Sequence, residues 1–283
     1  MDAQLEAIAD AYRAAYVAHD PKLAPISASV RFTENNVEMK FPDASWDAVT
    51  KELGPALTFS DPATGQAGVY TAIMMNDTPG FLAIRLKVVQ GQITEIEHIV
   101  STRRNLSGPP TPIGDVNAFV HDADLARELS DSERDTREEM VRLSDGYFST
   151  LSNNTGEIRG TRFAPDTRRF ENGMEFAKVE HLFKLGYYRF NERVRDRDYF
   201  LVDEKRGLVM CRAFIDHKGV LDSFTLTDGT EKKSIFREPH SWCVLELFKI
   251  KGGMITSIEA TFIGVPYNTR SPWTVNPWRL GAV

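Results

Sequence analysis

The chain has 283 residues, of which 42% are hydrophobic and 26% charged, a composition typical of a soluble globular protein with one large or two average domains. Its formal net charge of −6 argues against a nucleic-acid-binding protein, because phosphate contacts require a basic surface. The sequence contains no run of about 18 apolar residues, and its N-terminal segment lacks the basic start and apolar core of a signal peptide. We therefore expect a cytoplasmic protein that binds neither nucleic acid nor membrane.

The first half of the chain opens with a helical pattern. Apolar side chains recur at helical spacing and predict an amphipathic helix over residues 2–18. The residues on this spacing are Leu5, Ile8, Tyr12, Ala15 and Tyr16. Short strand-like runs follow at residues 29–41, 67–75, 81–89 and 93–101. A long helix followed by short strands is typical of the α+β class.

The second half repeats this order after a segment rich in proline and glycine. Residues 105–114, NLSGPPTPIG, mark a linker or a structured crossover. Ser132 can then cap a second amphipathic helix. Its apolar stripe consists of Met140, Leu143, Tyr147 and Leu151.

Further strand-like runs complete the second half. They cover residues 168–176, 195–203, 207–216, 241–250 and 254–264. Cys211 and Cys243 lie in two of these apolar runs. We expect both to be reduced thiols in the core, not a disulfide or a thiolate metal site.

Two segments recur in both halves and predict an internal repeat. ITEIEHIV at 93–100 reappears as ITSIEATF at 255–262, each after a glycine-containing turn. The segment at 31–39, RFTENNVEM, corresponds with one deletion to RFENGMEF at 169–176. The first copy carries His98 where the second carries Ala260. The predicted division is a first repeat at 1–105, a proline-rich linker or crossover at 106–129, a second repeat at 130–273 and a tail at 274–283.

On these paired segments and terminal hairpins, the chain resembles the nuclear-transport-factor-2-like superfamily, also called SnoaL-like, over nearly its whole length and twice. The resemblance implies two cone-shaped α+β repeats, each a long N-terminal helix packed on a curved antiparallel sheet around a pocket. Members of this superfamily include cofactor-free isomerases, dehydratases, cyclases and epoxide hydrolases, as well as proteins that only bind ligands. The tandem arrangement is also similar to the lignin-derived aromatic-dimer gamma-formaldehyde lyases of the superfamily.

The terminal hairpin of the first repeat suggests a catalytic pair. If Gln90-Gly91 is a two-residue turn, Arg85 lies opposite Ile96 and Ala83 lies opposite His98, all on one face. Arg85 would then be a diagonal neighbour of His98, so His98 could move a proton while Arg85 holds a developing anion. The alternative is a core histidine bonded to backbone or water, with Arg85 paired to a surface carboxylate.

In the second repeat the same reasoning gives an almost apolar face. Its predicted members are Leu245, Leu247, Ile258, Ala260 and Phe262. The other face would set Glu246 opposite Glu259, beside Trp242 and Val244. These carboxylates could form an acid/base dyad, or their face could be the exterior where repeats or subunits dock. A homo-oligomer through the outer sheet faces would follow from the second reading.

Other residues supply reserve candidates. His217 lies at a strand end beside Asp216 and is the reserve catalytic residue. No helix-spaced histidine pair, Gly-rich phosphate loop or nucleophile elbow is present, so we expect neither a metal nor a cofactor. Aromatic surface for a ligand could come from Trp46, Tyr70, Tyr187 and Tyr188, although single aromatic residues are more often part of the core.

These patterns predict a cofactor-independent lyase that acts on a hydrophobic, aromatic small molecule by acid/base chemistry. The similar lyases remove a hydroxymethyl group as formaldehyde from a diaryl dimer and leave a stilbene. Two alternatives stay open: a dehydratase, isomerase or cyclase of a polyketide or terpenoid, and a non-catalytic small-molecule carrier.

Overall fold

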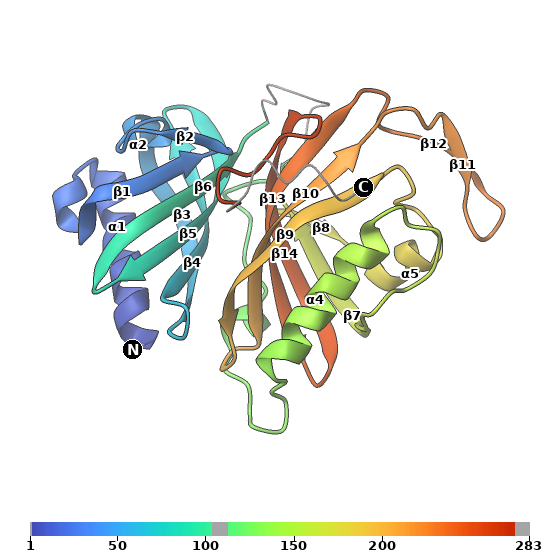
Figure 1. Cartoon of the computed structure of the whole chain (residues 1–283), viewed down its shortest axis with the longest axis horizontal. Helices are drawn as coiled ribbons and strands as arrows, with labels where there is room; N and C mark the ends of the chain where they lie inside the picture. The colour runs from blue at the N-terminus through green and yellow to red at the C-terminus, as the bar shows by residue number, and fades with distance from the viewer. Residues whose placement is uncertain (1, 104–112, 275–283) are drawn as a thin grey trace.

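The computed structural model describes residues 2–103 and 113–274, which form two units of the α+β class (Figure 1). The elements of the first unit are α1 (Asp2–Ala18), η1 (Pro21–Leu23), β1 (Ile26–Glu34), β2 (Val37–Met39), α2 (Ser45–Ala48), β3 (Val49–Asp61), β4 (Gln66–Met75), β5 (Thr78–Val89) and β6 (Gln92–Ser101). The later elements are α3 (Ala123–Ala126), α4 (Arg137–Leu151), β7 (Phe163–Glu171), β8 (Met174–Phe176), α5 (Val179–Lys184), β9 (Arg193–Asp203), β10 (Leu208–His217), β11 (Ser223–Thr225), β12 (Glu231–Lys233), β13 (His240–Lys251) and β14 (Met254–Pro266).

Both units have the same sheet topology, which confirms the predicted repeat. The six-stranded sheets run β2-β1-β6-β5-β4-β3 and β8-β7-β14-β13-β10-β9. Each sheet is mixed and not purely antiparallel as predicted, because β1 runs parallel to β6 and β7 runs parallel to β14. In the first unit, the β1–β2 hairpin forms one edge of the sheet and the chain then crosses to β3 at the other edge. The strands β4, β5 and β6 follow in order back across the sheet, so that β6 lies beside β1. The helix-and-sheet cones implied by the resemblance are present.

The two main helices occupy the predicted parts of the chain. The first begins and ends as expected, over Asp2–Ala18. The second begins at Arg137, later than the predicted cap at Ser132, because the Thr136 side chain accepts a hydrogen bond from the Glu139 amide and caps the helix. Ser132 lies instead in a turn. The sequence patterns also did not predict the long strand β3.

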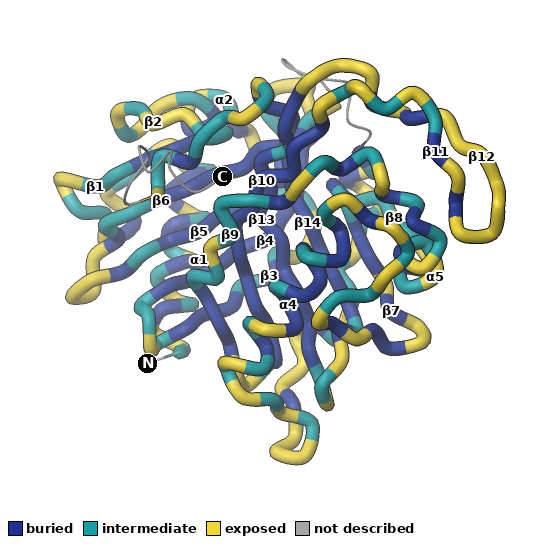
Figure 2. The backbone as a smooth tube through the Cα atoms, turned by 45° about the vertical axis from the view of Figure 1, so that its right-hand side comes forward, coloured by how far each residue is buried: buried dark blue, intermediate teal, exposed yellow. Residues whose placement is uncertain are grey.

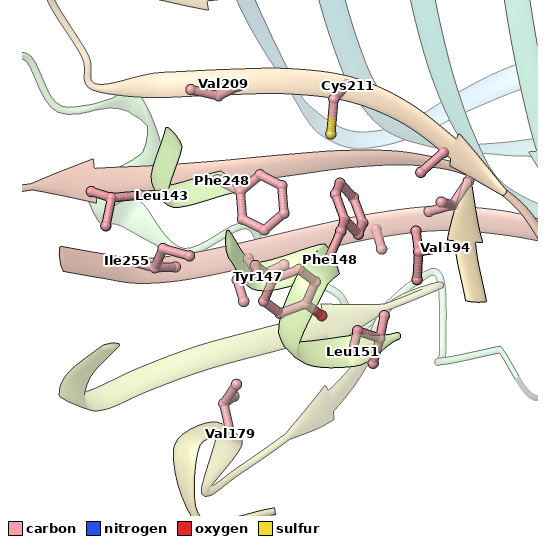
Figure 3. Packing of buried hydrophobic residues seen from close by; sticks show 14 of the residues in the cluster. Leu143, Tyr147, Phe148, Leu151, Val179, Val194, Val209, Cys211, Phe248 and Ile255 are labelled. Carbon is pink, nitrogen blue, oxygen red and sulfur yellow. The ribbon is translucent and has the colours of Figure 1, made fainter. Parts of the chain in front are cut away.

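Each helix covers one face of its sheet, which we call the helix side. Tyr12 and Tyr16 of α1 are buried against the first sheet, and Tyr147 and Leu151 of α4 occupy the same spacing against the second. Figure 3 shows Tyr147 and Phe148 of α4 among the side chains around Phe248. Burying each such side chain stabilises the fold by about 1.5 to 3 kcal/mol.

The opposite faces of the two sheets pack on each other, and we call this the interface side. Its core joins Phe59 and Ile99 of the first sheet to Met210, Cys243 and Leu245 of the second. Cys211 and Cys243 are both buried free thiols, as predicted. The strands that meet here are buried along most of their length, whereas the β11–β12 hairpin is largely exposed (Figure 2). The sheet faces opposite the helices therefore cover one another within one chain, and the predicted homo-oligomer stays a prediction.

A buried ion network crosses this interface. Arg85 donates from Nε to Glu97 at 2.7 Å, and Arg212 of the second sheet donates from Nε to the same carboxylate, also at 2.7 Å. Trp273 from the end of the described chain lies over the Arg85 guanidinium, 4.4 Å from the ring centroid. The second unit is thus joined to the first by apolar packing and by charge.

The predicted boundaries fall partly outside the described residues. Residues 104–112, which hold most of the proline-rich segment, and residues 275–283 of the predicted tail lie outside them. Where the description resumes, Ile113 and Val116 pack against Ala72 and Phe81 of the first sheet. The boundaries near 105 and 130 stay predictions.

Candidate functional site

A β-bulge in the terminal hairpin overturns the predicted register. Val88 pairs with Ile93, but Lys87 pairs with Glu95, so Thr94 is an extra residue on β6. Beyond this bulge Arg85 lies opposite Glu97, and His98 lies opposite Ile84. Because one extra residue moves every later pair by one position, Arg85 and His98 point to opposite faces of the sheet. They cannot act on one substrate as the predicted pair.

The second hairpin contains the same irregularity. Its register shifts between Lys249 and Ile250, which places Glu246 opposite Ala260 and leaves Glu259 opposite Leu247. Glu246 therefore lies on the helix side, whereas Glu259 faces the interface. Glu259 Oε2 lies 2.9 Å from His121 Nδ1. The predicted pairing of Glu246 with Glu259 is wrong, and so is the assignment of Glu246, Trp242 and Val244 to the exterior.

His98 fills the interior of the first cone. Its Nε2 lies 2.8 Å from the Tyr12 hydroxyl, and its Nδ1 lies 3.4 Å from Glu34 Oε2. The rings of Tyr16 and Phe32 each meet the imidazole edge to face, with both centroid distances at 5.4 Å. With 0% of its surface exposed, His98 has the surroundings of a core residue. Its predicted role in proton transfer stays a prediction.

The other candidates of the first repeat also lie in packed surroundings. Trp46 donates from Nε1 to the Tyr12 hydroxyl at 3.0 Å and is 1% exposed. Tyr70 is buried in the apolar interface between the two sheets. Arg85 belongs to the interface ion network. The predicted site in the first cone is thus occupied by its own side chains.

A cavity of about 510 Å³ opens instead in the second cone. Its volume lies within the range of about 300 to 1,000 Å³ typical of small-molecule sites. Ala260, at the position that His98 fills in the first cone, lies in its wall, and so do the predicted ligand residues Tyr187 and Tyr188. The full lining consists of Tyr147, Leu151, Arg169, Glu171, Met174, Phe176, Leu182, Tyr187, Tyr188, Phe190, Asn191, Ile215, Ile235, Phe236, Trp242, Val244, Glu246, Ala260 and Phe262.

One polar group of the cavity is an ion pair on β7. Arg169 Nε lies 3.1 Å from Glu171 Oε1, and the same guanidinium donates to the Tyr188 hydroxyl. The Arg169 side chain is 1% exposed and stacks on the Tyr188 ring at 5.0 Å. Side chains on alternate residues of a strand share a face, which is why Arg169 and Glu171 enter the cavity together.

The second polar group is the buried carboxyl of Glu246 on β13. Burial, reinforced by the negative charge of Glu171, raises the pKa of Glu246 to about 8, although Arg169 and a hydrogen bond with Tyr147 act in the opposite direction. Glu246 therefore carries its proton near neutral pH. Burial also raises the pKa of the Tyr147 hydroxyl well above its usual range. The cavity thus combines a protonated carboxylic acid with an ion-paired glutamate inside an apolar wall.

His217 lies next to this cavity, on the same side of the sheet as Trp242. Its Nε2 is 2.9 Å from Asn191 Oδ1, and its ring stacks on that of His240 at 4.4 Å. Burial, and then the neighbouring His240, lower the pKa of His217 well below its usual range. Among the described residues, no group of three or more His, Cys, Asp and Glu side chains is placed to hold a metal ion. A direct catalytic role for His217 stays a prediction.

Arg169, Glu171, Glu246 and Tyr147 were not predicted as one site. Two signals were available in the sequence: the RFENG segment places Arg169 and Glu171 on one strand face, and Tyr147 lies on the apolar stripe of its helix. The position of Glu246 could not be inferred, because the bulge decides which face it takes.

One domain family matches part of the chain. The domain family of unknown function DUF8021 matches residues 133–262, which contain α4 and most of the second sheet. None of the curated proteins matches the chain. No helix within residues 2–103 and 113–274 is long and apolar enough to cross a bilayer.

Several solved structures are similar to about half of this chain. A candidate ketosteroid isomerase from Kribbella flavida is 15% identical, with 39% of this chain and 85% of that chain covered and a TM-score of 0.28. A candidate hydroxylase from Streptomyces galilaeus is 14% identical, with 46% and 83% covered and a TM-score of 0.32. An NTF2-like protein from Anabaena variabilis is 13% identical, with 48% and 95% covered and a TM-score of 0.31.

Proposed function

We propose that the second cone is the active site of an enzyme that transfers protons on a hydrophobic, aromatic small molecule. The observation that carries this proposal is the buried carboxyl of Glu246, with its raised pKa, inside an apolar cavity that also holds the Arg169–Glu171 ion pair. A buried carboxylic acid and a second carboxyl group paired with arginine supply the acid and the base that proton transfer needs. The apolar wall favours an aromatic substrate.

Each polar group has a distinct role in this proposal. Glu246 donates a proton to a leaving oxygen, and Glu171 accepts a proton from the substrate. The guanidinium of Arg169 and the hydroxyl of Tyr188 stabilise negative charge that develops on a substrate oxygen. Because these groups are held in a largely buried site, their interactions with that charge are stronger than they would be in water.

The finer proposal is a lyase that acts on a diaryl dimer of the lignin type. Glu246 protonates the benzylic hydroxyl, which leaves as water, while Glu171 takes the phenolic proton and the phenolic electrons form a quinone methide. The Glu246 carboxylate, which has lost its proton, then removes the proton of the hydroxymethyl O–H, so that the C–C bond breaks and formaldehyde leaves. The electron pair of that bond forms the stilbene double bond, and Glu171 returns its proton to the phenolic oxygen, which restores the phenol ring. The products are a stilbene, formaldehyde and water, and no oxidant is needed.

The test is to incubate the purified protein with diaryl dimers that carry benzylic hydroxyl and hydroxymethyl groups, and to follow formaldehyde release and stilbene absorbance. We expect Glu246→Gln and Glu171→Gln to lower turnover by about 10²- to 10⁴-fold, the usual contribution of a general acid or base. Activity should also fall as pH rises past about 8, where Glu246 loses its proton.

The matched control is Glu259→Gln, on the same strand as Ala260 but on the interface side. Its turnover per folded molecule should stay near that of the parent protein. Equal activity of Glu246→Gln and the parent would refute the acid role. Tight binding of dimers without any turnover would show instead that the cone is a carrier.

A further inference from the structure

In the first cone, the His98 side chain fills the space that corresponds to the open cavity of the second cone. Glu34 pairs with His98 across parallel strands as Glu171 pairs with Ala260. The asparagine after each glutamate makes the same backbone hydrogen bond. The Asn35 amide donates to the His98 carbonyl at 2.9 Å, and the Asn172 amide donates to the Ala260 carbonyl at 2.8 Å. The two positions are therefore equivalent in register.

The helices match as well. The buried positions of α1 are Leu5, Ala9, Tyr12, Ala15 and Tyr16, and residues at the same spacing are buried in α4: Met140, Ser144, Tyr147, Thr150 and Leu151. Tyr12 and Tyr147 therefore take equivalent places above their sheets. In both cones a glutamate and a tyrosine flank the position of His98 or Ala260.

The His98 ring shows which chemistry fits between these two groups. Trp46 donates to the Tyr12 oxygen, so the Tyr12 hydroxyl hydrogen is free to point at His98 Nε2, 2.8 Å away. The other ring nitrogen, Nδ1, then carries the proton and faces the Glu34 carboxylate. The interior thus accepts a flat aromatic ring with a polar hydrogen on the edge that faces the glutamate.

The second cone keeps these flanking groups but lacks the ring. Ala260 has no side chain beyond Cβ, and Glu171 and Tyr147 line the space beside it. Glu34 is engaged by the amide and the hydroxyl of Ser45, whereas Arg169 is the one ion partner of Glu171 in the described part of the chain. Glu171 can therefore accept a further hydrogen bond from a ligand.

We propose that the ligand of the second cone places an aromatic ring over Ala260, with an O–H or N–H on its edge directed at Glu171. This inference rests on the proposed function and specifies its substrate class: a phenol or an azole, not a plain hydrocarbon. Ala260 is the residue that determines specificity, since its small side chain leaves the space that the ring occupies.

The proposal is tested by fragment binding, measured by titration calorimetry and by NMR, without turnover. The probes are phenol, 4-methylimidazole and toluene, which have similar size but differ in the polar hydrogen. Phenol and 4-methylimidazole should bind at least about tenfold more tightly than toluene, because only they can donate a hydrogen bond to the Glu171 carboxylate. Glu171→Gln should remove most of this preference.

In Ala260→His, the imidazole fills the space proposed for the ligand ring. Phenol can then no longer reach Glu171, so its affinity should fall at least about tenfold. His98→Gly is the mirror variant: 4-methylimidazole should raise its melting temperature, whereas toluene should raise it less. If Ala260→His does not fold, the probe preference and its loss in Glu171→Gln still decide the matter. Toluene binding as well as phenol, or unchanged phenol binding in both Ala260→His and Glu171→Gln, would overturn the proposal.

The outcome is separable from that of the proposed function. Glu259→Gln should keep the phenol preference, because Glu259 precedes Ala260 on the same strand but faces the interface. If fragments bind as expected while Glu246→Gln retains full turnover, the ring site stands and the acid role fails. If dimers are converted but fragments show no preference, the ring site fails and the acid/base chemistry stands.

Discussion

His98 and Ala260 occupy the same register position in two copies of one fold, each beside a glutamate of the parallel neighbouring strand. The imidazole closes the first cone by hydrogen bonding and ring packing, whereas the alanine methyl leaves the second cone open as a cavity of about 510 Å³. One side chain thus separates a packed core from an open cavity.

Replacing His98 by alanine should therefore lower stability and leave chemistry intact. The change creates a void and leaves the Tyr12 hydroxyl without its partner, so we expect the free energy of unfolding to fall by about 1 to 3 kcal/mol. Turnover per folded molecule should stay within about twofold of the parent, a margin well below the worth of a general acid or base. Chemical denaturation and turnover are measured together, with His181→Ala, an exposed histidine, as control. A stable but inactive His98→Ala protein would return the active site to the first cone.

Glu246 should make stability depend on pH in a defined direction. Its pKa is raised to about 8 in the folded protein, whereas the unfolded value is about 4.5. The folded state therefore binds the extra proton, so the contribution to stability is complete below pH 4.5 and is lost as pH rises through about 8. Glu246→Gln should be more stable than the parent at pH 9 and should show a flatter profile between pH 5 and 9. Parallel profiles for both proteins in urea unfolding would contradict this.

The buried histidines His217 and His240 should make the folded protein less stable as pH falls below about 6.5. Burial lowers the pKa of both His217 and His240, so the folded state keeps them neutral while the unfolded chain protonates near pH 6.5. Their contribution is complete above about pH 6.5 and is lost as pH falls, by up to about 1.4 kcal/mol per pH unit for each histidine. His217→Phe keeps a ring in the aromatic cluster and should flatten the slope between pH 7.5 and 5.5 in denaturant titrations. An unchanged slope would contradict this, because it would mean that His217 has the same pKa in the folded and unfolded states.

In the interface ion network, removal of the Glu97 carboxylate should lower stability more than removal of the Arg85 guanidinium. Burial alone would raise the pKa of Glu97, but Arg212 and Arg85 outweigh it and hold the pKa below its usual range. Glu97→Ala leaves two buried guanidinium groups without this carboxylate, so we expect a loss of about 3 to 5 kcal/mol. Arg85→Met leaves the Glu97–Arg212 pair in place and should cost less. Thermal unfolding and turnover per folded molecule are measured for both variants. Lower stability with unchanged turnover would confirm that Arg85 is structural, whereas a selective loss of turnover in Arg85→Met would contradict it.

Local patterns in the sequence were sufficient to predict most of the elements. Helical spacing gave residues 2–18, and alternating runs located the strands around 67–75, 81–89 and 93–101. The matching hairpin segments also predicted the repeat, because two stretches with the same alternation and turn chemistry form the same local structure. Burial of both cysteines followed from their apolar neighbours.

The site itself depended on contacts that no local pattern contains. Thr94 is one extra residue in a hairpin, and it turns Arg85 to the interface and His98 to the helix side. The matching bulge turns Glu246 into the cavity, where it meets Glu171 from another strand. The sequence by itself determined the helices, most of the strands and the presence of two equivalent units. Tertiary structure decided which faces pack together and which cone stays open, because side-chain direction depends on register, and the elevated pKa of Glu246 depends on burial by distant segments.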